Sequence, residues 1–166
     1  MMLDNEKLKT LEEAQIARDL CRRQAKTFVL TNGCFDILHP GHVFYLQKAA
    51  QKGHCLWIAL NSISSIQKNK GPNRPIQGDE ERAYLLAALG CVDGITIFTG
   101  QRLTSEILAL RPDIYIKSGE YTLDTLNREE RQALEHIGAN IQFVPFLSGF
   151  STTKLIQRVT LREKRD

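Results

Sequence analysis

The sequence contains no long apolar run. No segment approaches the roughly 20 apolar residues that a helix needs to cross a bilayer, and residues 1–7 carry Asp4 and Glu6 instead of the apolar core of a signal peptide. Paired cysteine spacings are missing too, since Cys21, Cys34, Cys55 and Cys91 form no Cys-x-x-Cys pattern. We therefore expect a cytoplasmic protein with reduced thiols, no membrane segment and no metal site of its own.

A large excess of one charge is also lacking. The chain has 22 Lys and Arg against 19 Asp and Glu, and its basic residues are spread without the interleaved aromatic residues of a nucleic-acid track. This balance fits a small anionic ligand and predicts no nucleic-acid partner. The Gly-x-Gly-x-x-Gly and Gly-x-x-x-x-Gly-Lys loops are absent as well, so dinucleotide-dependent oxidoreductases and P-loop enzymes lack their main support.

What the chain does contain is an alternation of strand and helix patterns over 166 residues, which predicts a single domain spanning residues 1–166. Residues 1–26 form a helical extension packed on it, because Thr10 and Glu13 make a capping box and apolar residues recur on one face. Strands are expected at residues 28–30, 55–60, 95–98, 114–117 and 141–144. Runs as apolar as residues 55–60 are typical of a parallel sheet covered on both sides.

These elements predict an α/β fold, a Rossmann-like doubly wound five-stranded parallel sheet with helices on both faces. Helices are expected at residues 40–52, 79–89, 127–138, before Pro112 and from Ser151. Asp79 is expected to cap one of them, and Asn127 with Glu130 to form a second capping box. Residues 62–78 are expected to be a long polar loop, a kind of segment that is usually functional or disordered.

The most informative segment, residues 31–42 (TNGCFDILHPGH), joins the first strand to the next helix. Pro40 favours the first helical position, which places His39 at the cap and His42 one turn inside. Gly41 allows close approach to the backbone, and the free N–H groups of a helix start attract anions. The pattern predicts a site for nucleotide phosphates, and we prefer it to a metal site because further ligands at zinc spacing are missing.

Other polar residues follow the remaining strands, where the ligand of a doubly wound sheet binds. Asn61 and Lys117 end two strands, and residues 151–153 (Ser-Thr-Thr) offer a second helix start suited to phosphate. The basic residues Lys70 and Arg74 lie in the expected loop. Arg82 is poorly placed for its own helix dipole, which an anionic ligand would explain.

Together these motifs resemble the nucleotidyltransferase superfamily with the His-x-Gly-His pattern, specifically the heptose 1-phosphate adenylyltransferase domain. The resemblance covers nearly the whole chain, with residues 31–42, 117–121 (KSGEY) and 149–153 (GFSTT) in the family's order. It implies transfer of AMP from ATP to a sugar 1-phosphate, D-glycero-β-D-manno-heptose 1-phosphate, with Mg²⁺ carried by the ATP. It also implies a separate sugar kinase that supplies the substrate, and a homodimer.

The resemblance and the strand-end positions assign three groups of residues. Catalytic roles are expected for His39, His42 and Lys117. Nucleotide binding is expected for Asn32, Gly33, Cys34, Phe35, Gly41, Gly119, Glu120, Gly149, Phe150, Ser151, Thr152 and Thr153. Substrate binding is expected for Asp36, Asn61, Lys70, Arg74 and Arg82, with Asp36 also bracing its turn through backbone amides.

The chain departs from the family pattern at Ile63, where the family has Asp, and at Ser118 and Glu120, where it has Gly and Asp. The exchange at Ile63 bears on the sugar that is accepted, or on activity itself. Residues 146–148 (Phe-Leu-Ser) replace an Arg-containing segment of the related glycerol-phosphate cytidylyltransferases, which favours ATP over CTP. Two alternatives stay open: a cytidylyltransferase acting on a polyol or amino-alcohol phosphate, and a non-catalytic nucleotide-binding protein of the same fold.

Overall fold

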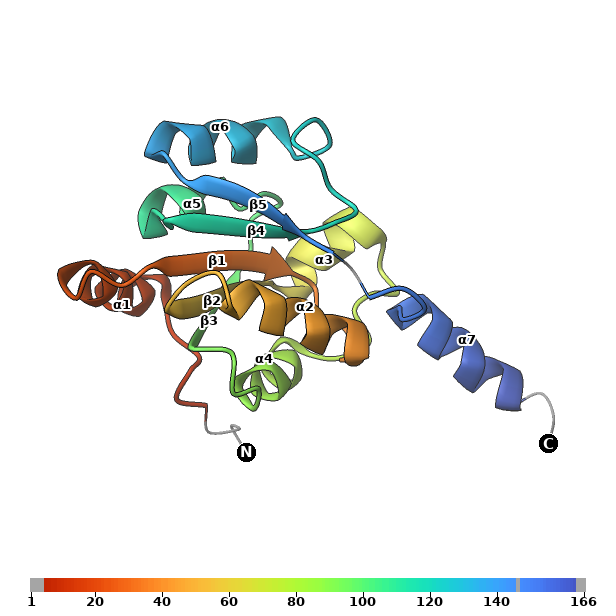
Figure 1. Cartoon of the computed structure of the whole chain (residues 1–166). Helices are drawn as coiled ribbons and strands as arrows, with labels where there is room; N and C mark the ends of the chain where they lie inside the picture. Colours follow the sequence, from red (N-terminus) through yellow and green to blue (C-terminus); the bar gives the residue numbers. More distant parts are fainter. Residues whose placement is uncertain (1–4, 146, 164–166) are drawn as a thin grey trace.

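A computed structural model shows one five-stranded sheet (Figure 1) and describes residues 5–145 and 147–163. Phe146 and the first four residues of the expected 1–26 extension therefore lie outside the described residues. The strands are β1 (Phe28–Gly33), β2 (Cys55–Asn61), β3 (Gly94–Phe98), β4 (Ile114–Ser118) and β5 (Asn140–Val144). They run parallel in the order β3-β2-β1-β4-β5. The prediction of a doubly wound parallel sheet is confirmed.

Helices cover both faces of this sheet. They are α1 (Leu11–Arg23), α2 (Pro40–Ala50), α3 (Ile63–Lys70), α4 (Asp79–Ala87), α5 (Thr104–Leu110), α6 (Arg128–Ile137) and α7 (Thr152–Glu163). On one face, α2 and α4 bury Leu46 and Leu86 in a core shared with β1 and β2. On the other face, α5 and α6 bury Ile107 and Leu134 in a second core. Each face of the sheet is thus shielded from water, as its continuous apolar strands require.

The segment before β1 is packed against the second core. Thr10 and Glu13 form the expected capping box, in which the Thr10 Oγ1 accepts from the Glu13 N–H and the Glu13 carboxylate accepts from the Thr10 N–H. The α1 side chain of Arg18 is buried and donates to Asp113 Oδ1 at 2.7 Å and to the Arg111 carbonyl at 3.0 Å. An ion pair between the buried Arg18 and the partly exposed Asp113, together with the bond to the Arg111 carbonyl, therefore fixes this helix to the segment before β4.

The expected loop at residues 62–78 is wrong in its first half, because residues 63–70 form α3. Ser62 caps this helix by accepting from the Ser65 N–H at 3.2 Å, and Ile66 is buried. The helix has only two apolar residues, Ile63 and Ile66, which is too weak a pattern for a helix prediction. Only residues 71–78 remain as an irregular connection.

Two predicted caps are also corrected. Gly78, not Asp79, is the N-cap of α4, and its N–H donates to the Glu81 carboxylate at 2.7 Å. Asn127 does cap α6 by accepting from two N–H groups, but Glu130 does not complete a capping box. The Glu130 side chain turns inward instead and accepts from the N–H of Leu103 at 3.0 Å. The contact with Leu103 therefore replaces the capping-box bond that the local sequence predicts for this carboxylate.

The last helix, α7, begins beside the sheet and points away from it (Figure 1). None of the helices in the described ranges has the length and apolar character needed to cross a membrane.

Candidate active site

The strand order places a switch point between β1 and β4, where the chain changes direction across the sheet. Ligands of doubly wound sheets bind at the carboxyl ends of the strands near such a point. A cavity of about 640 Å³ lies there. Its lining includes many predicted site residues, from four segments: Asn32, Gly33, Cys34, Phe35, Asp36, His42, Asn61, Lys70, Arg74, Lys117, Glu120 and Thr152.

The two histidines lie face to face at the start of α2. His39 is the N-cap with an extended backbone, Pro40 follows at the first helical position, and the imidazoles stack with centroids 3.8 Å apart. His42 lines the cavity, while His39 lies behind it with 5% of its surface exposed. The Phe35 ring meets His42 edge-on at 5.4 Å. The predicted helix start is confirmed, and packing on both sides fixes the orientation of His42.

Burial disfavours the charged form of both imidazoles. Burial first, and then the positive charges of His39 and Lys70, lower the pKa of His42 to about 4, while Asp36 opposes this effect. Burial also lowers the pKa of His39. The Nδ1 atom of His42 is buried without a hydrogen-bond partner among the described residues. A phosphate that binds here would meet a neutral imidazole that can donate a hydrogen bond. The negative charge of the phosphate would also favour the protonated form of that imidazole.

The starts of α2 and α7 adjoin each other. The Oγ1 of Thr152 donates to the Asp36 carbonyl at 2.7 Å, which ties α7 to the connection before α2. A Cβ added to Gly41 would lie 3.0 Å from the His39 ring and 3.3 Å from the Phe150 Cβ. A side chain at this position would therefore require the His39 ring or Phe150 to shift. The structure brings together the two helix starts that the sequence proposed as phosphate sites.

Lys117 at the end of β4 lies on the cavity wall with its orientation fixed by Asn32. The Asn32 side-chain oxygen accepts from the Lys117 Nζ and, at 2.9 Å, from the Tyr115 hydroxyl. The Tyr121 ring lies 5.1 Å from the ammonium group. Burial lowers the pKa of Lys117, so the site holds a desolvated cation that an anionic ligand would stabilise.

Asp36 braces the connection between α3 and α4. Its Oδ1 accepts from the N–H groups of Ile76 and Gln77 at 3.0 and 3.2 Å, and its Oδ2 lies 3.2 Å from the Arg74 guanidinium. The carboxylate is 3% exposed. The expected bonds to backbone amides are present, although the amides belong to a distant segment. This brace holds Arg74 at the cavity beside Lys70.

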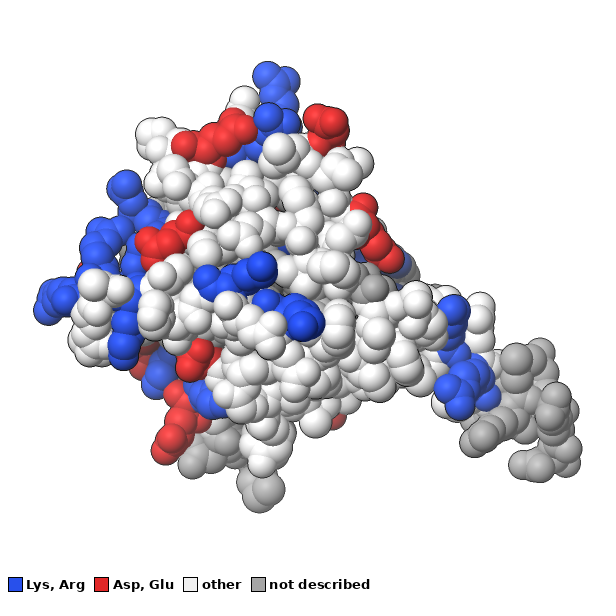
Figure 2. Space-filling model, viewed as in Figure 1, with Lys and Arg blue, Asp and Glu red and all other residues white. Residues whose placement is uncertain are grey.

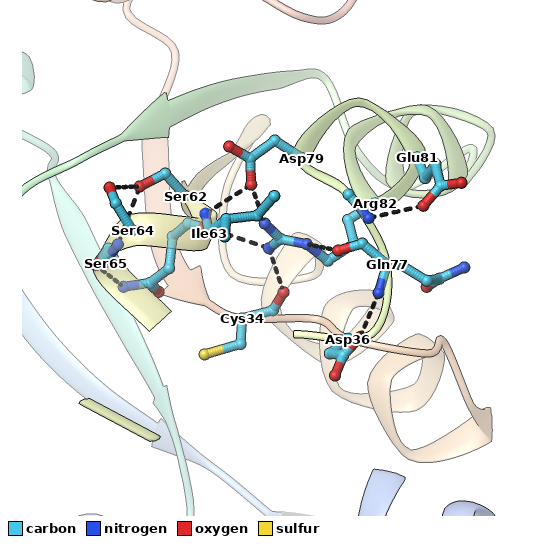
Figure 3. Close-up of polar contacts among 12 residues, drawn as sticks. Cys34, Asp36, Ser62, Ile63, Ser64, Ser65, Gln77, Asp79, Glu81 and Arg82 are labelled. Atoms are coloured by element: carbon cyan, nitrogen blue, oxygen red, sulfur yellow. Dashed lines mark hydrogen bonds and ion pairs between the residues drawn. The ribbon is translucent and has the colours of Figure 1, made fainter. Parts of the chain in front are cut away.

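The assignment of Arg82 to substrate binding is wrong. Its guanidinium is fully buried and donates to the carbonyls of Cys34, Asn61 and Gln77 and to the Asp79 carboxylate (Figure 3). Every nitrogen is engaged, so none is free for an anionic ligand. Arg82 instead joins the ends of β1 and β2 to the start of α4. A burial pattern cannot be seen from the sequence of one polar helix turn.

Ile63 lies away from the cavity. Its N–H donates to Asp79 Oδ1 at 2.7 Å, and its side chain, 36% exposed, is not part of the cavity lining. The same Asp79 oxygen accepts from Arg82, as Figure 3 shows. The departure from the family pattern at this position therefore removes no group from the cavity wall.

Several predicted nucleotide-binding residues are not part of the cavity lining. Gly41, Gly119, Gly149, Phe150, Ser151 and Thr153 belong to this group. A Cβ at Gly119 would lie 3.2 Å from the Val144 carbonyl, which shows how closely the β4 and β5 ends approach. Glycine thus serves chain packing here.

A second wall of the cavity escaped sequence reasoning. It comprises Asn69, Phe98, Gln101, Arg102, Thr125, Leu126, Asn127 and Glu130. Gln101 and Arg102 follow β3, so the rule that ligands meet strand ends could have found them. Residues 125–130 follow the β4 end by several positions, and no local pattern indicates that they return to the cavity.

Over the ranges 5–145 and 147–163, no group of three or more His, Cys, Asp or Glu side chains could hold a metal ion. Figure 2 shows Lys and Arg side chains in separate groups on the face in view, with acidic side chains between several of them.

Comparison with known proteins decides the family. The family model described as "Cytidylyltransferase-like" matches residues 30–158, a span that contains the whole cavity lining. The chain belongs to the cytidylyltransferase-like family. The prediction of a nucleotidyltransferase is thereby confirmed.

Curated relatives agree with the resemblance read from the motifs. The chain is 42% identical over 153 residues to "Bifunctional protein HldE" of Syntrophotalea carbinolica, covering 92% of this chain and 31% of that protein. It is 45% identical over 138 residues to HldE of Geobacter sulfurreducens, covering 83% and 28%. The chain therefore spans about a third of the length of these relatives.

A solved structure shares the fold. It is described as the crystal structure of the lipopolysaccharide core biosynthesis protein from Thermoplasma volcanium GSS1, with a TM-score of 0.60 and 24% identity. The match covers 74% of this chain and 97% of that chain. At this identity it supports the Rossmann-like arrangement of the sheet.

Proposed function

We propose that this protein transfers AMP from ATP to a sugar 1-phosphate, releasing pyrophosphate and forming an ADP-sugar. The observation that carries the proposal is the single cavity where His42, Lys70, Arg74, Lys117 and Thr152 converge beside two adjoining helix starts. Two anionic reactants require such a concentration of donors and cations. The resemblance to heptose 1-phosphate adenylyltransferases names D-glycero-β-D-manno-heptose 1-phosphate as the acceptor.

In the proposed reaction, a phosphate oxygen of the acceptor attacks the α-phosphorus of ATP. The new P–O bond forms as the bond from the α-phosphorus to the oxygen bridging it to the β-phosphorus breaks, and pyrophosphate carries away the electron pair. No protein base is required, because a phosphate monoester loses its second proton near pH ~6. The protein's contribution is orientation and stabilisation of developing charge.

The residues divide this work according to position. His42, supported by the stacked His39, donates to the phosphates at the α2 start, and the α7 start with Thr152 receives the far end of the triphosphate. Lys117, oriented by Asn32, compensates charge on the phosphoryl oxygens. Lys70 and Arg74 hold the acceptor phosphate, with Arg74 positioned by Asp36.

We further propose that Mg²⁺ arrives with the nucleotide. The cavity carboxylates do not form a cage: Asp36 is occupied by backbone amides and Arg74, and the described residues contain no three-ligand group. This donor set fits a cation held mainly by phosphates and water. Bound Mg²⁺ would neutralise phosphate charge. A kinase would supply the acceptor phosphate, and the homodimer remains a prediction.

A cytidylyltransferase acting on a polyol or amino-alcohol phosphate is the second candidate, because the matched family model is described as "Cytidylyltransferase-like". The test is Mg²⁺-dependent pyrophosphate release with D-glycero-β-D-manno-heptose 1-phosphate, run with ATP and with CTP. We expect release with ATP. Pyrophosphate release with CTP alone would overturn the base assignment. If neither nucleotide gives pyrophosphate release and ATP still binds, the non-catalytic alternative would be favoured.

A further inference from the structure

Part of the cavity lining, its second wall, has no role in the proposed phosphate chemistry. It comes from residues that follow β3 and from the start of α6, where Glu130 lies close enough to Lys117 to oppose the lowering of its pKa. Gln101 and Arg102 lie on this wall, as do Asn127 and Glu130. The cations assigned to phosphate, Lys70 and Arg74, come from α3 and the segment after it. The cavity therefore presents carboxylate and amide groups besides its cationic groups.

Glu130 is the central group of this wall. It is 7% exposed, and its Oε1 accepts from the Leu103 N–H at 3.0 Å. Its other carboxylate oxygen, Oε2, makes no hydrogen bond or ion pair with any residue that the structure describes, although the residue lines the cavity. This oxygen is not one of the fully buried unpartnered side-chain atoms of the described residues, so it is open to a donor that enters the cavity.

The charge of Glu130 restricts what that donor can be. A carboxylate repels phosphate, so Glu130 favours an uncharged group at its own position, while the cations Lys70 and Arg74 favour the acceptor phosphate. Hydroxyl groups satisfy a carboxylate through short charge-assisted hydrogen bonds. The Leu103 bond also fixes the start of α5, and thereby the preceding residues Gln101 and Arg102, at the same wall. An amide and a guanidinium add donors and an acceptor for further hydroxyls.

We propose that Glu130, together with Gln101 and Arg102, recognises the hydroxyl groups of the acceptor sugar and thereby determines acceptor specificity. This inference rests on the proposed function, because it concerns the second substrate of that reaction. The acceptor is preferred to the ribose of ATP because Gln101 and Arg102 follow β3 at one edge of the sheet, whereas α7, proposed to hold the triphosphate, follows β5 at the opposite edge. A three-carbon polyol phosphate is too short to offer a ring of hydroxyls.

The decisive variant is Glu130→Gln. It keeps a side-chain oxygen for the Leu103 N–H but replaces the cavity-facing oxygen by a donor, so a purely structural role would survive. Glu129→Gln is the matched control, since Glu129 is exposed on the same helix turn. Calorimetry would measure the affinity for heptose 1-phosphate in the presence of a non-hydrolysable ATP analogue, and steady-state kinetics would measure KM for each substrate.

For Glu130→Gln we expect the affinity for the sugar phosphate to fall about 10- to 100-fold, the range for a hydrogen bond to a charged group, while KM for ATP and Tm stay unchanged. The Arg102 side chain is exposed, so Arg102→Ala should also weaken binding of the sugar phosphate without affecting Tm. Unchanged sugar-phosphate affinity in both variants, or an increase confined to KM for ATP, would overturn the inference. Tight sugar-phosphate binding by a wild-type protein without turnover would refute only the proposed function, and absence of that binding would refute both.

Discussion

Replacing Arg82 by methionine should destabilise the fold instead of weakening the binding of a substrate. The guanidinium is fully buried and donates to three carbonyls, at 2.7 Å to Cys34, 2.8 Å to Asn61 and 3.2 Å to Gln77, besides its pair with Asp79. Methionine fills similar volume but donates no hydrogen bond. The carbonyls at the ends of β1 and β2 would then be buried without partners.

The expected cost follows from these contacts. Removing one member of a buried, hydrogen-bonded ion pair typically costs about 3–5 kcal/mol. The Asp79 side chain is 29% exposed and can recover some solvation, so we expect a value near the lower end, about 3 kcal/mol. Since small proteins have a free energy of unfolding of about 5–15 kcal/mol, this is a large share of the total.

Urea denaturation would measure this cost. The matched control is Arg131→Met, an arginine on α6 that is 38% exposed and pairs with Glu135 four residues away, where little or no loss of stability is expected. Arg82→Lys keeps a cation but cannot reach all the carbonyls, so its stability should fall between those of wild type and Arg82→Met. A methionine variant as stable as the control, with a raised KM for the sugar phosphate, would refute the structural role and restore Arg82 as a ligand.

The remaining predictions concern the histidine side of the cavity. His42→Ala should lower kcat by about 10² while folding survives, as for loss of one transition-state donor; near-normal turnover would remove His42 from the mechanism. Because the pKa of His42 is about 4 in the folded protein and about 6.5 when unfolded, the unfolded chain binds more protons between these values. The free energy of unfolding should therefore fall by up to about 3 kcal/mol from this group as pH drops from 6.5 to 4, and in urea titrations His42→Asn should show a correspondingly smaller decline. Gly41→Ala should retain wild-type Tm but raise KM for ATP about 10-fold, because its Cβ would press on the His39 ring and Phe150; Gly90→Ala, which has open space, should change neither quantity.

Much of the site followed from local sequence because local forces build it. The start of α2 depends on Pro40 and on the residues on either side of it, and the α1 cap depends on Thr10 and Glu13 three residues apart. The rule that ligands meet the carboxyl ends of parallel strands then placed Asn61 and Lys117 at one cavity. The same rule, applied to the end of β3, would have included Gln101 and Arg102.

The errors share one cause. Arg82, Glu130 and Asp36 each lie in a short polar stretch that suggests a cap, a turn brace or a ligand, and each finds its partners in a segment far along the chain. Likewise, α3 forms in a polar stretch because Ser62 caps it and the rest of the fold buries Ile66. Which partner a polar side chain takes depends on what approaches it after packing.

The sequence by itself determined the strands, their parallel arrangement and the phosphate-suited start of α2, because apolar runs, capping residues and helix-start geometry act over a few neighbouring residues. Only the tertiary structure decided which charged groups face the cavity and which form their hydrogen bonds and ion pairs inside the protein. Burial makes an unpaired charge costly, so packing pairs the Arg82 guanidinium with backbone carbonyls and turns Glu130 toward the Leu103 N–H at the cavity wall.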